Sequence, residues 1–503
     1  MYGRMAEKNK EQGIIIKKGS GFLRTALVYP NTYNTGMSSL GFQTVYKLAN
    51  EIDFVACERF FLPNNSPKQD QQSLKSLESG FPLKNFDIIL FSISFENDFL
   101  NIVKILQKAG IPLRSSDRYQ NHPLIVAGGI ACILNPEPIS YFMDCFLLGE
   151  AECMLEKFFS FFMRQKNNQS FLQRLEEKIP GAYVPFTHDK NTDYIKKSKI
   201  KVQYQKNLDN TFTHTCILSS NTTFKNTFLI EISKGCPYAC KFCSAGFFYH
   251  PLRNYPLKNI KQSIDKAKGK TDRIGLVSSA IADHPDLLKI CDYGLENGFK
   301  LSFASIRTNK INDEIISKLV KSKTKTVAIA PETGSQRLRD IINKQITDKQ
   351  ILLSTKKLVE AGIINLKIYY IIGLPFENND DIYAIVDLTK KIKQVFLQAS
   401  RKKSKIGTIT LSINPFIPKP FTPFQWALME KKSILKDKMN IIRQGLKKVP
   451  NIKLNFESLR KAQINAFLSL ADKKAGKVIE DALKYGWQAA IRKNKDFIEG
   501  SNL

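Results

Sequence analysis

The chain has 503 residues and a formal net charge of +30, from 76 Lys and Arg against 46 Asp and Glu. This length is too great for one hydrophobic core and predicts about two or three domains. Hydrophobic residues make up 43% of the chain, but no apolar run reaches the roughly 18 residues of a membrane span. We therefore expect a folded protein with no membrane association.

The nine cysteines show no spacing typical of a disulfide framework. The N-terminal stretch MYGRMAEKNKEQG lacks the apolar core of a secretory signal, so reduced thiols and a cytoplasmic location are expected. The excess positive charge is mostly Lys, spread along the chain in runs such as 196–206 and 401–405. Such runs are more often solvated loops, so a nucleic-acid partner is an alternative that the charge does not favour.

The first 20 residues are charged and predict a disordered tail. Apolar strand patterns then alternate with amphipathic helical patterns up to residue 155, which predicts a doubly wound, Rossmann-like parallel sheet over 21–155. The strand patterns lie at 22–30, 86–94, 122–130 and 141–152. Ligands of such sheets bind at the carboxyl ends of the strands. A helix and a polar connection follow, and we interpret 156–225 as a linker region.

From residue 226 the alternation of strands and helices resumes. Strand patterns lie at 228–233, 273–279, 301–306, 326–330, 366–373 and 408–415. Six such units predict a partial or full TIM-like (β/α) barrel over 226–426, with its site at the carboxyl ends of the strands. The remainder, 427–503, is basic and is expected to form a helical C-terminal region.

One stretch, EISKGCPYACKFC, places Cys236, Cys240 and Cys243 in a loop directly after a predicted strand. A structural zinc site requires a fourth ligand, and the nearest histidine is His250, without a paired ligand close by. An iron–sulfur cube held by three thiolates leaves one iron open to a chelating ligand. The triplet therefore favours a cluster with one vacant coordination site, with zinc or chance packing of buried cysteines as the alternatives.

C-x3-C-x2-C with Phe242 before the last cysteine closely resembles the signature of the radical S-adenosylmethionine (SAM) enzymes. The resemblance implies a 4Fe-4S cluster whose open iron is chelated by the amino and carboxylate groups of SAM. One-electron reduction would then cleave SAM to methionine and a 5′-deoxyadenosyl radical. The family also implies an electron donor such as flavodoxin or ferredoxin.

Further segments resemble the cofactor-binding parts of this family. In APETGSQRLRDIINK, the resemblance assigns Glu332 to the ribose hydroxyls of SAM; an acid near a helix N-terminus is the alternative. Arg339 and Arg307 are placed to hold a carboxylate bidentately, or else to form surface salt bridges. Gly373 in IIGLPFE would allow a close approach of the adenine, or would simply end a strand.

One segment departs from the family pattern. Many members carry Gly-Gly-Glu after the second barrel strand, where it meets the methionyl amino group. Here LVSSAIADHP puts Ser278 and Ser279 in that place. Hydroxyls or backbone carbonyls can accept the same hydrogen bonds, so this contact stays open.

Residues 22–152 resemble the cobalamin-binding domain that precedes the radical barrel in one large subgroup. The resemblance is carried by IVAGGIACILNPEPISYFMDCFLLGEAE, in which Gly128, Gly129 and Gly149 would admit the nucleotide tail of a corrinoid. Alternatively, these glycines are only turn residues. The Asp-x-His-x-x-Gly motif for a lower cobalt ligand is absent, so the axial ligation stays open.

These observations predict a cobalamin-dependent radical SAM methyltransferase acting on an unidentified substrate. An alternative is sulfur insertion of the tRNA methylthiotransferase type, which needs three further cysteines for a second cluster. Cys57, Cys132 and Cys145 are the only ones available for it, and two of them fall in apparent strands or next to one. A second alternative, favoured by the Ser-Ser replacement, is a non-catalytic corrinoid or iron–sulfur sensor.

Overall fold

The computed structural model describes residues 11–63, 74–166, 168, 170–185, 200–303, 305–401 and 406–495. The chain divides into two compact units. Unit 1 comprises Met1–Lys206, Thr213–Asn226 and Phe467–Asn502, and unit 2 comprises Asn207–Phe212 and Thr227–Ala466. No helix within the described ranges is long and apolar enough to cross a membrane.

Unit 1 contains a six-stranded sheet in the order β2-β1-β3-β4-β5-β6. Its strands are β1 (Leu23–Thr32), β2 (Val55–Leu62), β3 (Ile88–Ser92), β4 (Leu124–Gly128), β5 (Cys145–Leu147) and β6 (Ala182–Tyr183). The first five are parallel, and only β6 runs antiparallel to its neighbour. The strand order reverses direction between β1 and β3, which is where doubly wound sheets bind ligands. The four predicted strands are present, and β2 and β6 are additional.

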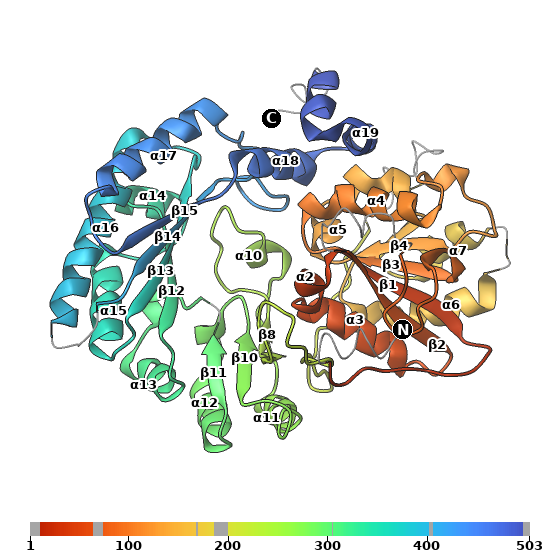
Figure 1. The fold of residues 1–503 in the computed structure, drawn as a ribbon, viewed down its shortest axis with the longest axis horizontal. Coiled ribbons are helices and arrows are strands. Elements are labelled where there is room, and N and C mark those ends of the chain that lie inside the picture. Colours follow the sequence, from red (N-terminus) through yellow and green to blue (C-terminus); the bar gives the residue numbers. More distant parts are fainter. Residues whose placement is uncertain are drawn as a thin grey trace. The chain divides into compact units, whose positions relative to one another are not determined.

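Helices cover both faces of this sheet (Figure 1). They are α2 (Tyr33–Met37), α3 (Leu40–Glu51), α4 (Phe99–Ala109), α5 (Ile130–Leu134), α6 (Ala151–Gln165) and α7 (Phe171–Lys178). A further helix, α19 (Ala475–Lys493), packs on α4 and not on the sheet itself. On one face, Phe42 and Tyr46 of α3 and Phe158 of α6 pack against Leu27 of β1, and all four are fully buried. Apolar residues at helical spacing in α3 and α6 thus bury one side of each helix.

The segment 11–20 is ordered, so the prediction of a disordered tail over 1–20 is wrong for this part; residues 1–10 lie outside the described residues. Glu11 is buried in an ion pair with Arg59 at 2.7 Å. The Gln12 amide donates to the Leu218 carbonyl at 2.9 Å, and the Tyr46 hydroxyl donates to the Ile15 carbonyl at 2.8 Å. The Glu11 carboxylate therefore neutralises the buried Arg59 guanidinium. Sequence composition alone does not show such a pairing.

Unit 2 contains two parallel sheets, in the orders β11-β10-β7 and β12-β13-β14-β15. Its strands are β7 (Phe228–Glu231), β10 (Arg273–Val277), β11 (Lys300–Phe303), β12 (Thr326–Glu332), β13 (Asn365–Ile372), β14 (Ile409–Pro415) and β15 (Ile452–Phe456), plus the short pair β8 (Ser233–Lys234) and β9 (Arg253–Asn254). All six predicted strands are present. The expectation that 427–503 is wholly helical is wrong, because β15 lies within it. Its sequence, IKLNF, alternates apolar and polar residues, as a strand with one half-buried face does.

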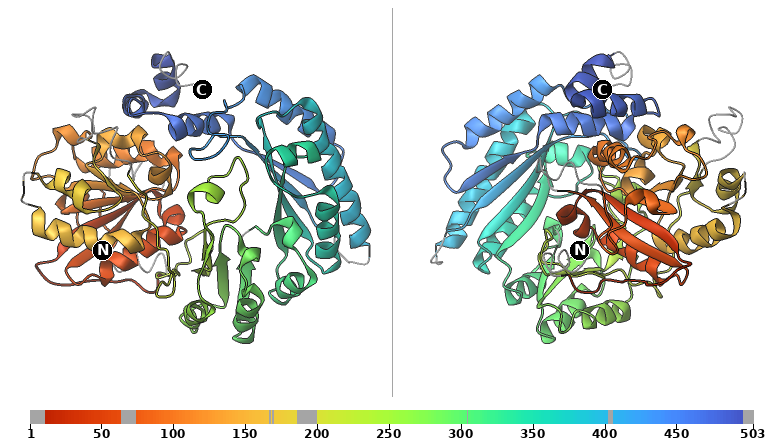
Figure 2. Two further views of the ribbon diagram at one scale, coloured as in Figure 1. Left: turned by 180° about the vertical axis from the view of Figure 1, so that it is seen from behind. Right: turned by 45° about the vertical axis from the view of Figure 1, so that its right-hand side comes forward.

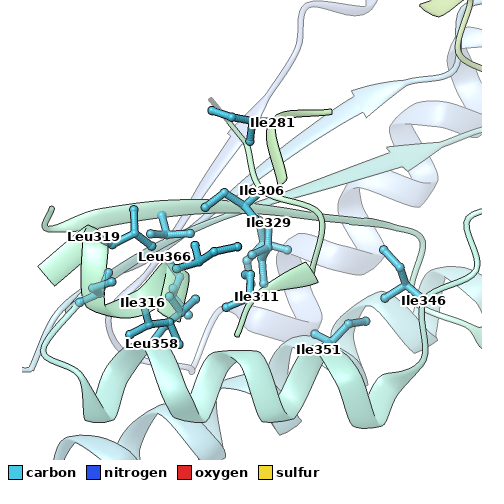
Figure 3. Close-up of a cluster of buried hydrophobic side chains, with 14 of the residues drawn as sticks. Ile281, Ile306, Ile311, Ile316, Leu319, Ile329, Ile346, Ile351, Leu358 and Leu366 are labelled. Carbon is cyan, nitrogen blue, oxygen red and sulfur yellow. The ribbon is translucent and has the colours of Figure 1, made fainter. Parts of the chain in front are cut away.

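The described helices of unit 2 are α10 (Ala245–Phe248), α11 (Leu257–Asp265), α12 (Leu287–Glu296), α13 (Asp313–Lys321), α14 (Gln336–Ile341), α15 (Asp348–Glu360), α16 (Asn379–Ser400), α17 (Lys432–Leu446) and α18 (Leu459–Leu470). Most of them, among them α11, α12, α13, α15, α16 and α17, lie along the outer side of the strands, whereas α10 lies on their inner side (Figures 1 and 2). Figure 3 shows the core between the outer helices and the strands, where Ile316 of α13 and Leu358 of α15 meet Ile329 and Leu366 of β12 and β13. This packing fixes the strand ends that carry the site.

The described residues from 467 to 495 belong to unit 1. The Asn135 side-chain amide donates to the carbonyls of Ser469 and Ala471 at 3.1 and 2.9 Å. Gly476 lies so close to the Tyr141 ring that a Cβ would be 2.6 Å from it. The region predicted as one C-terminal part, 427–503, is therefore divided at Phe467.

Candidate cofactor site

The three cysteines lie in unit 2 on the loop between β8 and α10, just beyond the carboxyl end of β7. The Cys243 amide donates to the Cys240 carbonyl at 3.0 Å, which makes a tight turn. The Lys241 amide donates to the Ile342 carbonyl at 3.0 Å and ties this turn to the end of α14. All three thiols are free, with Cys240 buried and the other two partly exposed. The loop thus presents three thiols, two of them from one hydrogen-bonded turn.

Two glycines let this loop fold back on itself. Gly235 has a φ of +90°, and a Cβ there would lie 2.0 Å from the Tyr249 carbonyl oxygen. A Cβ on Gly246 would lie 1.8 Å from the Tyr238 carbonyl oxygen. Real Cβ atoms do not approach so closely, so both positions require glycine. The conformation of the cysteine loop is consequently fixed by backbone contacts.

The thiols lie within electrostatic reach of one another. Burial raises the pKa of Cys243, and the nearby Cys240, Cys236 and Glu332 raise it further. Burial also raises the pKa of Cys236. Coordination to a cation reverses this, because a metal-bound thiol is deprotonated.

Across the described part of the chain, no three His, Cys, Asp or Glu side chains are placed to share one metal ion. In an iron–sulfur cluster each cysteine binds a different iron, so the sulfurs need not converge on one point. Three free thiols on a glycine-shaped loop fit that kind of group.

Polar side chains from two strand ends brace the loop. The Tyr238 hydroxyl, between the first two cysteines, donates to Asp283 at 2.7 Å. The Arg307 guanidinium stacks on the Tyr238 ring, 3.9 Å from its centroid, and donates to the Lys344 carbonyl. Lys310 pairs with Asp283 at 2.9 Å. Sequence reasoning missed Tyr238 and Asp283, because no spacing rule singles them out.

Arg307, predicted to hold a carboxylate, is thus used mainly to support the cysteine loop. Its Nε is buried and has no hydrogen-bond partner, and the same is true of Oδ2 of Asp283. Buried polar atoms are normally paired, so unpartnered ones beside a proposed cofactor site are compatible with a ligand or water there.

Glu332 ends β12 with a φ of +69°, and the β12–β13 register shifts just before it. The residue is 9% exposed, and its carboxylate accepts a hydrogen bond from Lys344 Nζ at 2.7 Å. A non-glycine residue in the left-handed region is uncommon and is often found at functional sites. The structure therefore places the predicted ribose-binding acid near Cys243 and gives it a lysine partner that sequence reasoning missed.

Arg339 is completely buried, contrary to its predicted contact with a ligand carboxylate. All five of its N–H donors are used inside the chain. Their acceptors are the carbonyls of Ile346, Thr333 and Gly334 and the side chains of Gln336 and Asp348. No donor is left for a ligand, so this arginine fixes the loop that follows Glu332.

At Gly373, predicted to allow a close approach of the adenine, the side of the residue that would carry a Cβ faces the protein. Its φ is +77°, its amide donates to Glu377 at 2.7 Å, and a Cβ would lie 2.8 Å from the Leu435 side chain. The space left by its missing side chain is therefore filled by α17. Phe242 packs against a cluster formed by Leu338, Ile342, Leu374, Phe416 and Phe424.

The serines after β10 have different environments. Ser278 shares a hydrogen bond with Ser233 at 2.6 Å, and its hydroxyl accepts from the Ala280 amide at 3.0 Å. It therefore links the end of β10 to the strand that leads into the cysteine loop. Ser279 is exposed.

In unit 1 the three glycines predicted to admit a corrinoid tail mainly face the chain itself. A Cβ on Gly129, whose φ is +102°, would lie 2.4 Å from the Ile93 carbonyl oxygen, and one on Gly149 would lie 2.5 Å from that of Gln203. Gly128 is less crowded, with its nearest atom at 3.3 Å. The structure thus favours the interpretation of Gly129 and Gly149 as sites of close backbone approach, and Gly128 also lies against backbone, although less tightly.

Comparison with protein families gives two matches. Residues 41–185 match the model described as "Radical SAM proteins, N-terminal", and residues 230–389 match the radical SAM superfamily. The second match includes the cysteine loop and Glu332.

Among curated proteins, the chain is 28% identical to an uncharacterised protein of Methanocaldococcus jannaschii, over 90% of both chains. It is 25% identical to an uncharacterised methyltransferase of Pyrococcus horikoshii, over 33% of this chain and 37% of that protein.

Among solved structures, the cobalamin-dependent S-adenosylmethionine radical enzyme OxsB, with aqua-cobalamin and SAM bound, has a similar fold. The TM-score is 0.53 at 14% identity, over 94% of this chain and 67% of that one. Together with the cysteine loop, the two family matches identify the chain as a member of the radical SAM superfamily.

Proposed function

We propose that this protein is a radical SAM enzyme that binds a 4Fe-4S cluster through Cys236, Cys240 and Cys243 and cleaves SAM reductively. The observation that carries the proposal is the glycine-shaped loop, which holds three free thiols at the carboxyl ends of the strands of unit 2. The bound cluster would supply one electron to SAM, releasing methionine and a 5′-deoxyadenosyl radical.

The residues of the chain have separate tasks in this proposal. Tyr238, Asp283 and Arg307 hold the cysteine loop against the ends of β10 and β11. Glu332 would offer a carboxylate to the ribose hydroxyls; it ends β12 with a left-handed φ and lies close enough to Cys243 to raise the pKa of that thiol. Because Lys344 already pairs with Glu332, binding of the ribose would require the lysine to share or release that carboxylate.

We further propose that unit 2 is a partial TIM-like barrel, and that unit 1 is a Rossmann-like domain that binds cobalamin. The strand order of unit 1 and the fold likeness to OxsB support this. The ligand would lie at the carboxyl ends of the strands, where the strand order reverses between β1 and β3. The complete reaction would be methyl transfer to an unidentified substrate, which agrees with the description of the Pyrococcus relative.

Incubation of anaerobically reconstituted protein with dithionite and SAM tests the first proposal. We expect 5′-deoxyadenosine from the wild type and none from Cys240→Ser. Protein that holds a full cluster and yet forms no 5′-deoxyadenosine would contradict it. Cobalt retained after incubation with hydroxocobalamin and desalting tests the second proposal separately.

The alternative of tRNA methylthiolation requires a second cluster in the N-terminal part. Cys57, Cys132 and Cys145 are each no more than 2% exposed, and burial raises the pKa of all three. Thiols packed in this way act as core residues. The described geometry therefore favours one cluster, and about four irons per chain instead of eight would support this.

A further inference from the structure

Three large apolar side chains are exposed on the segment that follows β14 in unit 2. Phe421, Trp426 and Leu428 are 51%, 85% and 62% exposed, although they lie within eight residues of one another. The same segment buries Phe416 and Phe424 beside Phe242. Exposed apolar side chains that cluster on a segment with its own buried residues are typical of an interaction site.

This segment is attached directly to the cysteine loop. The Phe424 amide donates to the carbonyl of Lys241, which lies between Cys240 and Cys243, at 3.2 Å. Phe421 also contacts Phe248 of α10, with ring centroids 5.9 Å apart. A molecule bound to the exposed aromatic residues would therefore rest on the loop that carries the proposed cluster.

The charges around this surface are mainly positive. The cysteine loop, residues 233–250, contains Lys241 and no acidic residue, and its other lysine, Lys234, pairs with Glu231 at 3.4 Å. The segment 416–432 contains three lysines and one acid, Glu430, which pairs with Lys438 at 3.3 Å. Lys431 and Lys432 are exposed directly after the aromatic residues. Such a rim attracts an acidic partner and repels a basic one.

We propose that this surface, made of Phe421, Trp426, Leu428, Lys431 and Lys432, docks an acidic one-electron carrier protein of the flavodoxin or ferredoxin class. The inference rests on the proposed function, which needs one electron for each SAM cleaved. The reduced carrier loses one electron, and the group held by the cysteines gains it; no atom is transferred. Electron transfer needs a close approach of the two redox groups, which this attachment to the cysteine loop provides.

The features of the surface suit a transient complex. Electron-transfer partners use small interfaces, and charges at the rim raise the rate of their encounter. Aromatic residues with nearby lysines also bind single-stranded nucleic acid by stacking. We favour the carrier because the surface is fixed to the cysteine loop, and RNA binding is an outcome of the test.

The experiment compares two reductants with the same reconstituted protein. The rate of 5′-deoxyadenosine formation is measured with reduced flavodoxin and, separately, with dithionite, which needs no docking surface. The variants are Trp426→Ala and the pair Lys431→Glu/Lys432→Glu. A matched control is Lys447→Glu/Lys448→Glu, an equal charge change on exposed lysines at the other end of α17. Tyr383→Ala, an exposed aromatic residue on α16, is the control for Trp426.

We expect Trp426→Ala and the Lys431/Lys432 pair to slow the flavodoxin-driven rate by about tenfold, with the dithionite rate unchanged. The controls keep both rates. The wild-type flavodoxin rate should also fall as salt is raised. Negative charge at a helix N-terminus is favourable, so the charge variant should fold.

Three results would overturn the proposal while leaving the proposed function intact: equal loss with both reductants, no loss with either, or a wild type that flavodoxin does not reduce. Loss of binding to single-stranded RNA in Trp426→Ala, with unchanged flavodoxin kinetics, would assign the surface to nucleic acid. No 5′-deoxyadenosine from the wild type with dithionite would contradict the proposed function itself.

Discussion

Replacing Gly246 with alanine sets two effects against each other in the cysteine loop. Gly246 lies in α10, where alanine is the better helix former by about 0.5–1 kcal/mol. The new Cβ would, however, lie 1.8 Å from the Tyr238 carbonyl oxygen, and tolerable contacts begin at 3.0 Å. The Tyr238 backbone would have to retreat by about 1.2 Å. Overpacking of a rigid site costs about 1–3 kcal/mol, so the steric effect wins.

Tyr238 lies between Cys236 and Cys240, so its displacement separates two of the predicted ligands. We expect Gly246→Ala to retain less than half of the iron and sulfide of the wild type after anaerobic reconstitution and desalting. The thermal unfolding midpoint should fall by only a few degrees, because the cost of about 1–3 kcal/mol is small for a chain of this length. Gly41→Ala in α3 is the control, since no atom lies within 3.9 Å of its Cβ. Full wild-type iron in Gly246→Ala would refute the reasoning.

Three further predictions concern buried charges. Burial raises the pKa of Asp98 to about 6, so its ionisation opposes folding and stability falls as the pH rises from about 4 to 6. Asp98→Asn should therefore gain up to about 3 kcal/mol at pH 7 and nothing at pH 4 in urea titrations; an equal gain at both pH values would contradict this. Arg59→Ala leaves Glu11 and Glu78 buried without their cation. It should lower the free energy of unfolding by about 3–5 kcal/mol, measured as a lower midpoint in guanidinium titrations. A midpoint equal to that of the wild type would argue against a buried ion pair. Arg339→Lys should lower stability by about 2–4 kcal/mol with an unchanged KM for SAM, whereas a raised KM at wild-type stability would restore its predicted contact with a ligand.

Sequence patterns predicted the strands whose apolar residues dominate the run. The apolar part of FDIILFSIS is buried in β3, and LKIYYIIG has one lysine in an otherwise apolar run, although β13 alternates buried and half-buried residues. β2 and β15 were missed because VACERFFL and IKLNF are shorter apolar patterns broken by charged or polar residues. One of the two charges in β2 belongs to Arg59, whose side chain is neutralised by buried carboxylates from distant segments. Such pairings depend on tertiary structure and have no local pattern.

Some features of the candidate site could be predicted from the sequence and others could not. The cysteine spacing predicted the membership in the radical SAM superfamily, which the family matches confirm. Residue type alone could not distinguish Arg339, whose donors all serve its own loop, from an arginine with a free face. Glycines posed the same problem, because Gly129 and Gly373 make room for the chain's own atoms. Tyr238 and Lys344 act through contacts with residues distant in the sequence, so their roles cannot be predicted from a local sequence pattern.

The central claim is that three cysteines hold a cluster with one iron open to SAM. The low-temperature electron paramagnetic resonance spectrum of the dithionite-reduced protein, recorded before and after addition of SAM, tests it most directly. We predict a reduced 4Fe-4S signal that changes when SAM binds and that is absent from Cys240→Ser. A spectrum that SAM leaves unchanged, or a preparation that holds zinc in place of iron, would contradict the claim.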